Sequence, residues 1–174
     1  MDDIVLVPYD PQWPRLFEQE AARVRDLLGE LVTRIEHIGS TAVPGLPAKP
    51  IIDLLVGVRS LDEAKQRAVP LLEAVGYSYW RDNPNKERMF LVKGLPPNGP
   101  RTHHLHMVEP ASDSWERLLF RDYLRAHADE AQRYATLKHD LVAQFPEDRE
   151  GYTDGKSKYI AGVMAKARAA MEIS

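Results

Sequence analysis

The chain has 174 residues, a formal net charge of −3 at pH 7 and no cysteine, and its length predicts a single domain over residues 1–174. Without cysteine there is no disulfide scaffold, no cysteine-ligated metal site and no thiol nucleophile. The mild acidity argues against duplex DNA as a partner, because duplex binders carry a strong basic excess.

Apolar residues at helical spacing predict a first helix that begins near Pro11 and is capped by Asp10. Strands are predicted at 33–38, 51–58, 77–81, 88–93 and 103–108. Further helices are predicted at 60–75 with a kink at Pro70, after a cap at Ser112 or Asp113, and around 130–144 and 155–170. Proline-rich loops are predicted at 44–50 and 95–100. This order predicts an α/β (α+β) domain with a mixed β-sheet, packed helices and a helical C-terminal third.

The hydropathy of the chain and its N-terminal residues indicate where in the cell the protein is expected. No apolar run approaches the roughly 18 residues that a membrane helix needs. The N-terminus begins Met1-Asp2-Asp3, whereas a signal peptide begins with basic residues. We therefore expect a cytoplasmic protein that does not insert into membranes.

The segment from 36 to 56 carries the strongest functional signal. Gly39 allows a sharp turn, and successive N–H groups with the hydroxyls of Ser40 and Thr41 would form a nest for phosphate oxygens. Asp53 is the one charge in an apolar strand, where an unpaired carboxylate is costly unless it binds a partner or a cation. Each feature alone is more often structural. Together they match the nucleotidyltransferase fold, in which Gly-Ser holds a triphosphate and strand carboxylates hold Mg²⁺.

The chain from Tyr9 to Ile160 resembles the GrpB family of small bacterial proteins, which is assigned to the nucleotidyltransferase-like superfamily. The nine residues from His37 to Gly45 match most specifically. Matching pieces are also found at 9–13, 48–53, 104–106, 120–125, 134–138 and 152–156. The resemblance implies the fold, and a related domain is attached to some dephospho-coenzyme A kinases.

The predicted metal site departs from the enzyme pattern. Nucleotidyltransferases place a second acid two residues after the first, and here that position is Leu55. His104 and His106 share one face of a later strand and are candidate replacements. The expected cofactor is a divalent metal, Mg²⁺ or Mn²⁺ with Zn²⁺ as an alternative. Asp53 together with both histidines would suit Zn²⁺, Mn²⁺, Fe²⁺ or Ni²⁺ better than Mg²⁺. Otherwise the imidazoles would contact phosphate, act as a general base or form a solvent-facing strand side.

Basic residues in the matching segments are the candidate anion ligands. Arg121, Lys138 and Lys156 would neutralise phosphate charge, and Lys49 lies on the loop before Asp53. Arg117, Arg121 and Arg125 share one helix face. The competing interpretation is a solvated, salt-bridged helix surface.

The sequence supports three candidate functions. The first, slightly favoured, is a metal-dependent nucleotidyltransferase that uses Asp53, His104 and His106 to transfer a nucleotidyl group from an NTP to a small acceptor. The second is a binding module for a nucleotide, coenzyme A or another phosphorylated metabolite, which Leu55 supports. A third is different metal chemistry at the Asp/His/His group. The base, the acceptor, the metal and the oligomeric state stay open.

Overall fold

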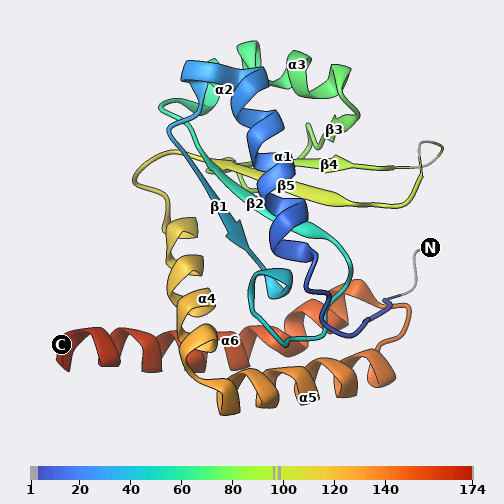
Figure 1. The fold of residues 1–174 in the computed structure, drawn as a ribbon, viewed down its shortest axis with the longest axis vertical. Coiled ribbons are helices and arrows are strands. Elements are labelled where there is room, and N and C mark those ends of the chain that lie inside the picture. Colours follow the sequence, from blue (N-terminus) through green and yellow to red (C-terminus); the bar gives the residue numbers. More distant parts are fainter. Residues whose placement is uncertain (1–3, 96, 98, 174) are drawn as a thin grey trace.

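The computed structural model describes residues 4–95, 97 and 99–173, within which the chain has a mixed α/β fold with a five-stranded sheet and six helices (Figure 1). The acidic start at residues 1–3, and Pro96 and Asn98 of the predicted loop at 95–100, lie outside the described residues. The sheet order is β1 (Arg34–Ile38), β2 (Ile52–Gly57), β5 (His103–Val108), β4 (Arg88–Lys93) and β3 (Tyr77–Tyr79). Among these strands, β2 and β5 run parallel and the other neighbours are antiparallel. The predicted mixed sheet is confirmed.

Three helices cover one face of the sheet: α1 (Trp13–Leu28), α2 (Leu61–Arg67) and α3 (Val69–Ala74). The Asp10 carboxylate accepts a hydrogen bond from the Gln12 N–H just before α1. The Ser60 hydroxyl caps α2. The predicted helix over 60–75 is interrupted at Ala68, because Pro70 stands in the first turn of α3 and cannot continue the hydrogen bonding of α2.

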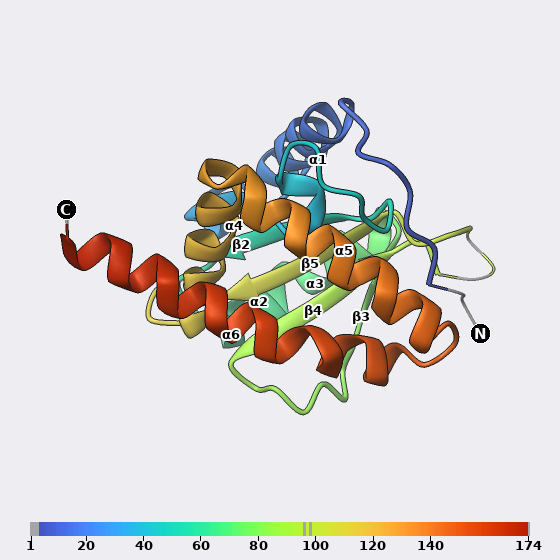
Figure 2. The ribbon, with the colours of Figure 1, turned by 90° about the horizontal axis from the view of Figure 1, so that it is seen from below.

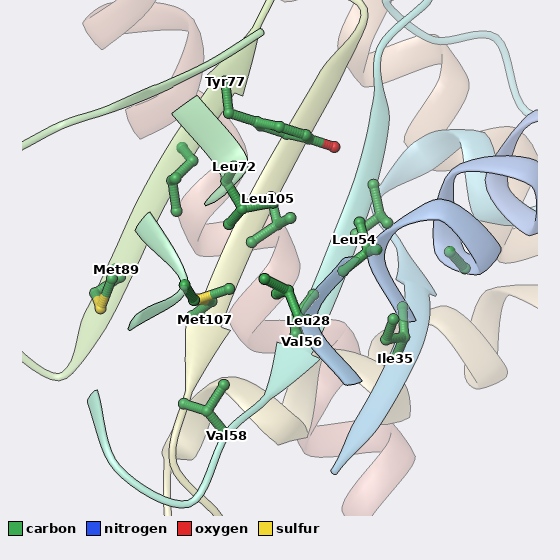
Figure 3. Close-up of a cluster of buried hydrophobic side chains, with 14 of the residues drawn as sticks. Leu28, Ile35, Leu54, Val56, Val58, Leu72, Tyr77, Met89, Leu105 and Met107 are labelled. Atoms are coloured by element: carbon green, nitrogen blue, oxygen red, sulfur yellow. The ribbon is translucent and has the colours of Figure 1, made fainter. Parts of the chain in front are cut away.

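Period-2 alternation decides which side chains fill the main core. Leu54, Val56, Leu105 and Met107 point from the two central strands toward α1–α3 and have no exposed surface (Figure 3). Burying each such side chain contributes about 1.5–3 kcal/mol. The alternate residues, Asp53 and Leu55 of β2 and His104 and His106 of β5, must therefore face the other side of the sheet.

Three helices lie on the other side of the sheet: α4 (Arg117–Ala126), α5 (Ala128–Gln144) and α6 (Arg149–Ile173). These helices pack on one another and on Val43 and Leu46 of the loop before β2, forming a second apolar cluster. Figures 1 and 2 show α5 and α6 running side by side, with α6 extending past α4 at its C-terminal end. None of the helices in the described ranges is long and apolar enough to cross a bilayer.

Two features of the C-terminal third differ from the prediction. α6 begins at Arg149 rather than near Gly155, because Asp148 accepts a hydrogen bond from the Gly151 N–H and starts the helix earlier. Gly155 lies inside the helix, where an added Cβ would collide with the Leu141 side chain. That glycine lets α5 and α6 approach closely. α4 is preceded by a 3₁₀ turn over Asp113–Glu116, capped by Ser112 as predicted.

Candidate functional site

A cavity of about 610 Å³ lies between the strand face that carries Asp53 and the helices α4, α5 and α6. The helices that wall it pack on one another and on the loop before β2. All ten residues that the sequence predicts for a site line this cavity, from five separate elements and their loops: Gly39, Ser40, Thr41, Lys49, Asp53, His104, His106, Arg121, Lys138 and Lys156.

Asp53 and the two histidines form a hydrogen-bonded group at the cavity floor. The parallel register places Asp53 opposite His104, so His106 comes next on the same face. Asp53 Oδ1 lies 3.1 Å from His106 Nε2 and 3.4 Å from His104 Nδ1. Although burial raises the pKa of the Asp53 carboxyl, its hydrogen bonds with His104 and His106 hold that pKa below its usual value. Asp53 is therefore an anion at neutral pH.

Arg88 fixes the tautomer of His106. Its Nη1 lies 3.1 Å from His106 Nδ1, and a guanidinium can only donate. Nδ1 must accept, so the ring proton lies on Nε2 and points to Asp53. Burial lowers the pKa of His106 to about 4, although Asp53 acts in the opposite direction. The ring is therefore neutral at pH 7. Both nitrogens of His106 are thus engaged, whereas His104 keeps a buried Nε2 without a partner among the described residues.

Gly39 is required by the position of Asp53. Its φ of +77° is a left-handed conformation that side chains rarely adopt. A Cβ at this position would also lie 2.6 Å from Asp53 Oδ2. The close approach of the turn and the carboxylate is therefore possible only for glycine.

The hydroxyls after Gly39 are held by protein groups. Thr41 Oγ1 lies 2.9 Å from His37 Nε2, and the His37 ring stacks on Phe17 with 4.6 Å between centroids. Burial lowers the pKa of His37 to about 4, so this ring is neutral as well. The Ser40 side chain is hydrogen-bonded with Tyr134 of α5. These contacts fix the turn, and direct phosphate binding by either hydroxyl stays a prediction.

Three lysines converge at one end of the cavity. Lys49 Nζ and Lys156 Nζ lie 5.1 and 4.4 Å from the ring centroid of the buried Tyr152. Lys138 is 2% exposed and donates a hydrogen bond to the Pro47 carbonyl. None of the three forms an ion pair with a carboxylate in the described part of the chain. We call Lys49, Lys138 and Lys156 the lysine cluster.

Burial and mutual repulsion lower the pKa values in the lysine cluster. The pKa of Lys138 falls to about 7 because of burial first, and then because of Lys156 and Lys49. The pKa of Lys156 falls to about 8 through burial and Lys49, against the opposing effect of Asp53. Burial also lowers the pKa of Lys49. This end of the cavity therefore holds more positive charge than its own surroundings stabilise.

Of the three arginines on α4, two have side-chain hydrogen-bond partners among the described residues and one has none. Arg121 donates to Glu36 and Asp122 at 2.8 Å and to the His37 carbonyl at 3.1 Å. Its guanidinium thus joins α4 to β1, which favours a positioning role over phosphate binding. Arg125 donates to the Ala42 carbonyl. Arg117 lines the cavity, and its side chain has no hydrogen bond or ion pair among the described residues.

The position of the expected second acid is apolar. Leu55 has no exposed surface and packs with Ile38, Val108, Trp115 and Leu118. Across the described residues, no group of three His, Cys, Asp or Glu side chains is arranged to hold a metal ion. The expected Asp53, His104 and His106 ligand set is present as neighbours, but as partners of one another.

Sequence reasoning missed Arg88, Tyr134 and Tyr152. Tyr134 and Tyr152 both line the cavity and contact the lysine cluster. Arg88 shares its strand face with Phe90 and lies beside His106 through the antiparallel pairing of β4 and β5. Alternation along 88–93 could have placed Arg88 on the site face, but its partner strand could not be read from the sequence.

Comparison with known proteins identifies a matching family and several relatives of this chain. The family model described as GrpB protein matches residues 3–166. A UPF0157 protein of Pseudomonas aeruginosa is 49% identical over 170 residues, covering 97% of this chain and 69% of that protein. The crystal structure of the conserved protein GrpB from Enterococcus faecalis superposes with a TM-score of 0.83 at 35% identity, covering 94% of this chain and 96% of that one. A dephospho-CoA kinase of Mycobacterium bovis is 30% identical over 185 residues, covering 93% of this chain but 45% of that protein. On the family match and these similarities, the chain belongs to the GrpB family.

Proposed function

We propose that the cavity binds a phosphorylated small molecule and that the lysine cluster holds its phosphate. The observation that carries the proposal is the convergence of three ammonium groups around Tyr152 and Tyr134 without a carboxylate partner among the described residues. Desolvated like charges destabilise a fold unless a ligand neutralises them. A phosphate dianion supplies that neutralisation.

The dimensions of the cavity support a metabolite of nucleotide size. Its volume of about 610 Å³ falls within the usual range of small-molecule sites. Apolar side chains of Phe120, Ile160 and Met164 line part of the wall and suit the body of such a ligand. The similarity to part of a dephospho-CoA kinase also favours a nucleotide or coenzyme A-like compound.

Nucleotidyl transfer from an NTP is the second candidate. The observation that favours it is the contact of Gly39 with the Asp53 carboxylate at the cavity floor. Asp53 is 24% exposed on its side chain, and its Oδ2 has no hydrogen bond within the described residues. One Mg²⁺ or Mn²⁺ held by this oxygen and by substrate oxygens fits the donors, since hard cations prefer oxygen. A three-ligand Zn²⁺ site fits less well, because both nitrogens of His106 are engaged.

The two candidates differ in the role of Asp53. In binding alone, the carboxylate accepts a hydrogen bond from the ligand. In transfer it would hold the cation that neutralises the reacting phosphates, so that an acceptor hydroxyl displaces pyrophosphate. The burial of Leu55 in an apolar cluster leaves one acid where a two-cation mechanism needs two, which places binding first.

A thermal-shift panel tests the proposal. The full chain is melted with ATP, GTP, coenzyme A, AMP and adenosine, each alone and with Mg²⁺, Mn²⁺ or Zn²⁺. A ligand at about 100 times its Kd stabilises by about 2.7 kcal/mol, or roughly 5–10 °C for a chain of this size. We expect phosphorylated compounds to raise Tm and adenosine not to do so.

Matched variants identify the site that is responsible. The double variant Lys138→Met, Lys156→Met should lose the shift, whereas Lys158→Met, an exposed lysine on the same helix as Lys156, should keep it. A shift that survives in the double variant would contradict the proposal. Pyrophosphate release with an NTP and Mg²⁺ that is lost in Asp53→Asn would establish transfer, and binding without release would restrict the function to binding.

A further inference from the structure

A second cationic group lies apart from the lysine cluster in the same cavity. Lys49 comes from the loop before β2, so the cluster is reached from the N-terminal ends of the parallel strands. Arg117 begins α4 and is reached from the C-terminal end of β5 through the 3₁₀ turn. The charges that act on Arg117 are those of Asp53 and Arg88, whereas the lysines act on one another and on Asp53. Asp53 is thus the charged neighbour that both groups share.

The surrounding fold gives Arg117 no structural task. Its helix neighbours Arg121 and Arg125 hold Glu36 and the Ala42 carbonyl, but the side chain of Arg117 has no hydrogen bond or ion pair among the described residues. The adjacent Glu116 pairs with Arg168 of α6 instead. A basic side chain in the first turn of a helix is also disfavoured by the helix dipole. An exposed guanidinium that lines the cavity and has no side-chain partner among the described residues suits an anionic ligand.

We infer that Arg117 is a second phosphate-binding residue and that the ligand of this cavity is a small molecule with two separated phosphoryl groups. One phosphate lies at the lysine cluster, which rests on the proposed function, and the other lies at Arg117. The planar guanidinium can bind a phosphate through two parallel hydrogen bonds.

The group between the two phosphates follows from the chemistry of Asp53. A continuous phosphate chain would pass the carboxylate and be repelled by it. A sugar or similar polyol instead donates hydroxyl hydrogen bonds to Oδ2, which has no partner among the described residues. The inference therefore describes a sugar bisphosphate or a nucleoside carrying two separate phosphates.

Matched ligand pairs test the inference by titration calorimetry on the full chain. AMP is compared with adenosine 3′,5′-bisphosphate, and fructose 6-phosphate with fructose 1,6-bisphosphate. The two ligands of a pair differ by one phosphate, and the distance between the two phosphates of the bisphosphate differs from one pair to the other. We expect the bisphosphate of at least one pair to bind about tenfold more tightly than its partner, as a charge-assisted bidentate contact allows. Arg117→Ala should remove that gain and change binding of the monophosphate by less than about twofold. Arg117→Lys should recover part of the gain, and Arg15→Ala, an exposed arginine on α1, should leave it intact.

The outcomes separate this inference from the proposed function. If the monophosphates bind but the second phosphate adds nothing in either pair, the inference is overturned and the lysine-cluster proposal stands. The same conclusion follows if Arg117→Ala weakens both members of a pair equally. If no phosphorylated probe binds, both proposals fail.

Discussion

Replacing Lys138 by methionine should make the ligand-free protein more stable and abolish phosphate binding. Lys138 is 2% exposed, and its positive charge is opposed by burial and by the charges of Lys156 and Lys49. Methionine has a similar length and no charge, so it removes the cause of the repulsion without leaving a large cavity. A structural lysine would show the opposite effect.

The expected gain follows from the pKa of the amine. Lowering it from 10.5 to about 7 corresponds to about 4–5 kcal/mol of lost stability for the protonated form, at about 1.4 kcal/mol per pKa unit. Loss of the hydrogen bond to the Pro47 carbonyl offsets about 1–2 kcal/mol. The net gain should be about 2–4 kcal/mol, or roughly 4–16 °C in Tm.

The pH dependence has a definite sign. Because the pKa is lower in the folded chain, the unfolded chain binds more protons between about pH 7 and pH 10.5, and wild-type stability rises with pH in that window. The advantage of Lys138→Met should therefore be largest at and below pH 7 and disappear toward pH 10.5.

Urea unfolding of both proteins across this pH range is the assay. Lys93→Met is the matched control, because Lys93 pairs at 2.8 Å with the buried Glu20. Its loss should destabilise by about 1–3 kcal/mol, allowing for partial solvent exposure of the ammonium. A Lys138→Met protein that is less stable than wild type near pH 7 would refute the reasoning.

Three further substitutions test individual contacts. Gly39→Ala should cost about 1–2 kcal/mol for the left-handed backbone alone and push the Asp53 carboxylate away, which a thermal melt and a Mn²⁺ titration detect; unchanged melting would contradict the geometry. Leu55→Asp should cost about 3–5 kcal/mol in urea unfolding, because its carboxylate enters an apolar cluster; near-wild-type stability would mean that the position can hold an acid. Arg88→Met should shift the ¹⁵N resonance of His106 Nδ1, because it removes the donor to that nitrogen while the Asp53 carboxylate keeps the proton on Nε2; an unaltered spectrum would show that Arg88 does not contact the ring.

Much of the fold was predictable because local patterns coincide with burial. The strands 88–93 and 103–108 have the predicted bounds, since alternating apolar residues there face the main core. The interruption near Pro70 follows from proline chemistry alone. The early start of α6 was not predictable in the same way, because Gly151 and Gly155 resemble helix ends and are tolerated only through close packing on Phe145 and Leu141.

In the candidate site, too, local patterns were predictable and contacts between distant elements were not. Period 2 placed His104 and His106 on one face of their strand, and the parallel register of β2 and β5 brings them beside Asp53. The state of His106 depends on Arg88, which reaches it through an antiparallel pairing that the sequence did not reveal. The engagement of Arg121 by Glu36 is likewise a contact between distant elements. Convergence of residue types was therefore predictable, whereas their hydrogen-bond partners needed the structure.

The side-chain amine of Lys138 reports most directly on whether the lysine cluster binds phosphate. In protein labelled with ¹³C-lysine, the Lys138 resonance is assigned by its absence in Lys138→Met and followed across pH with and without inorganic pyrophosphate. The account predicts a pKa near 7 in the free protein and a rise of more than about one unit with pyrophosphate, because an adjacent anion favours the charged amine. A pKa that starts at its ordinary value, or one that saturating pyrophosphate leaves unchanged, would contradict the account.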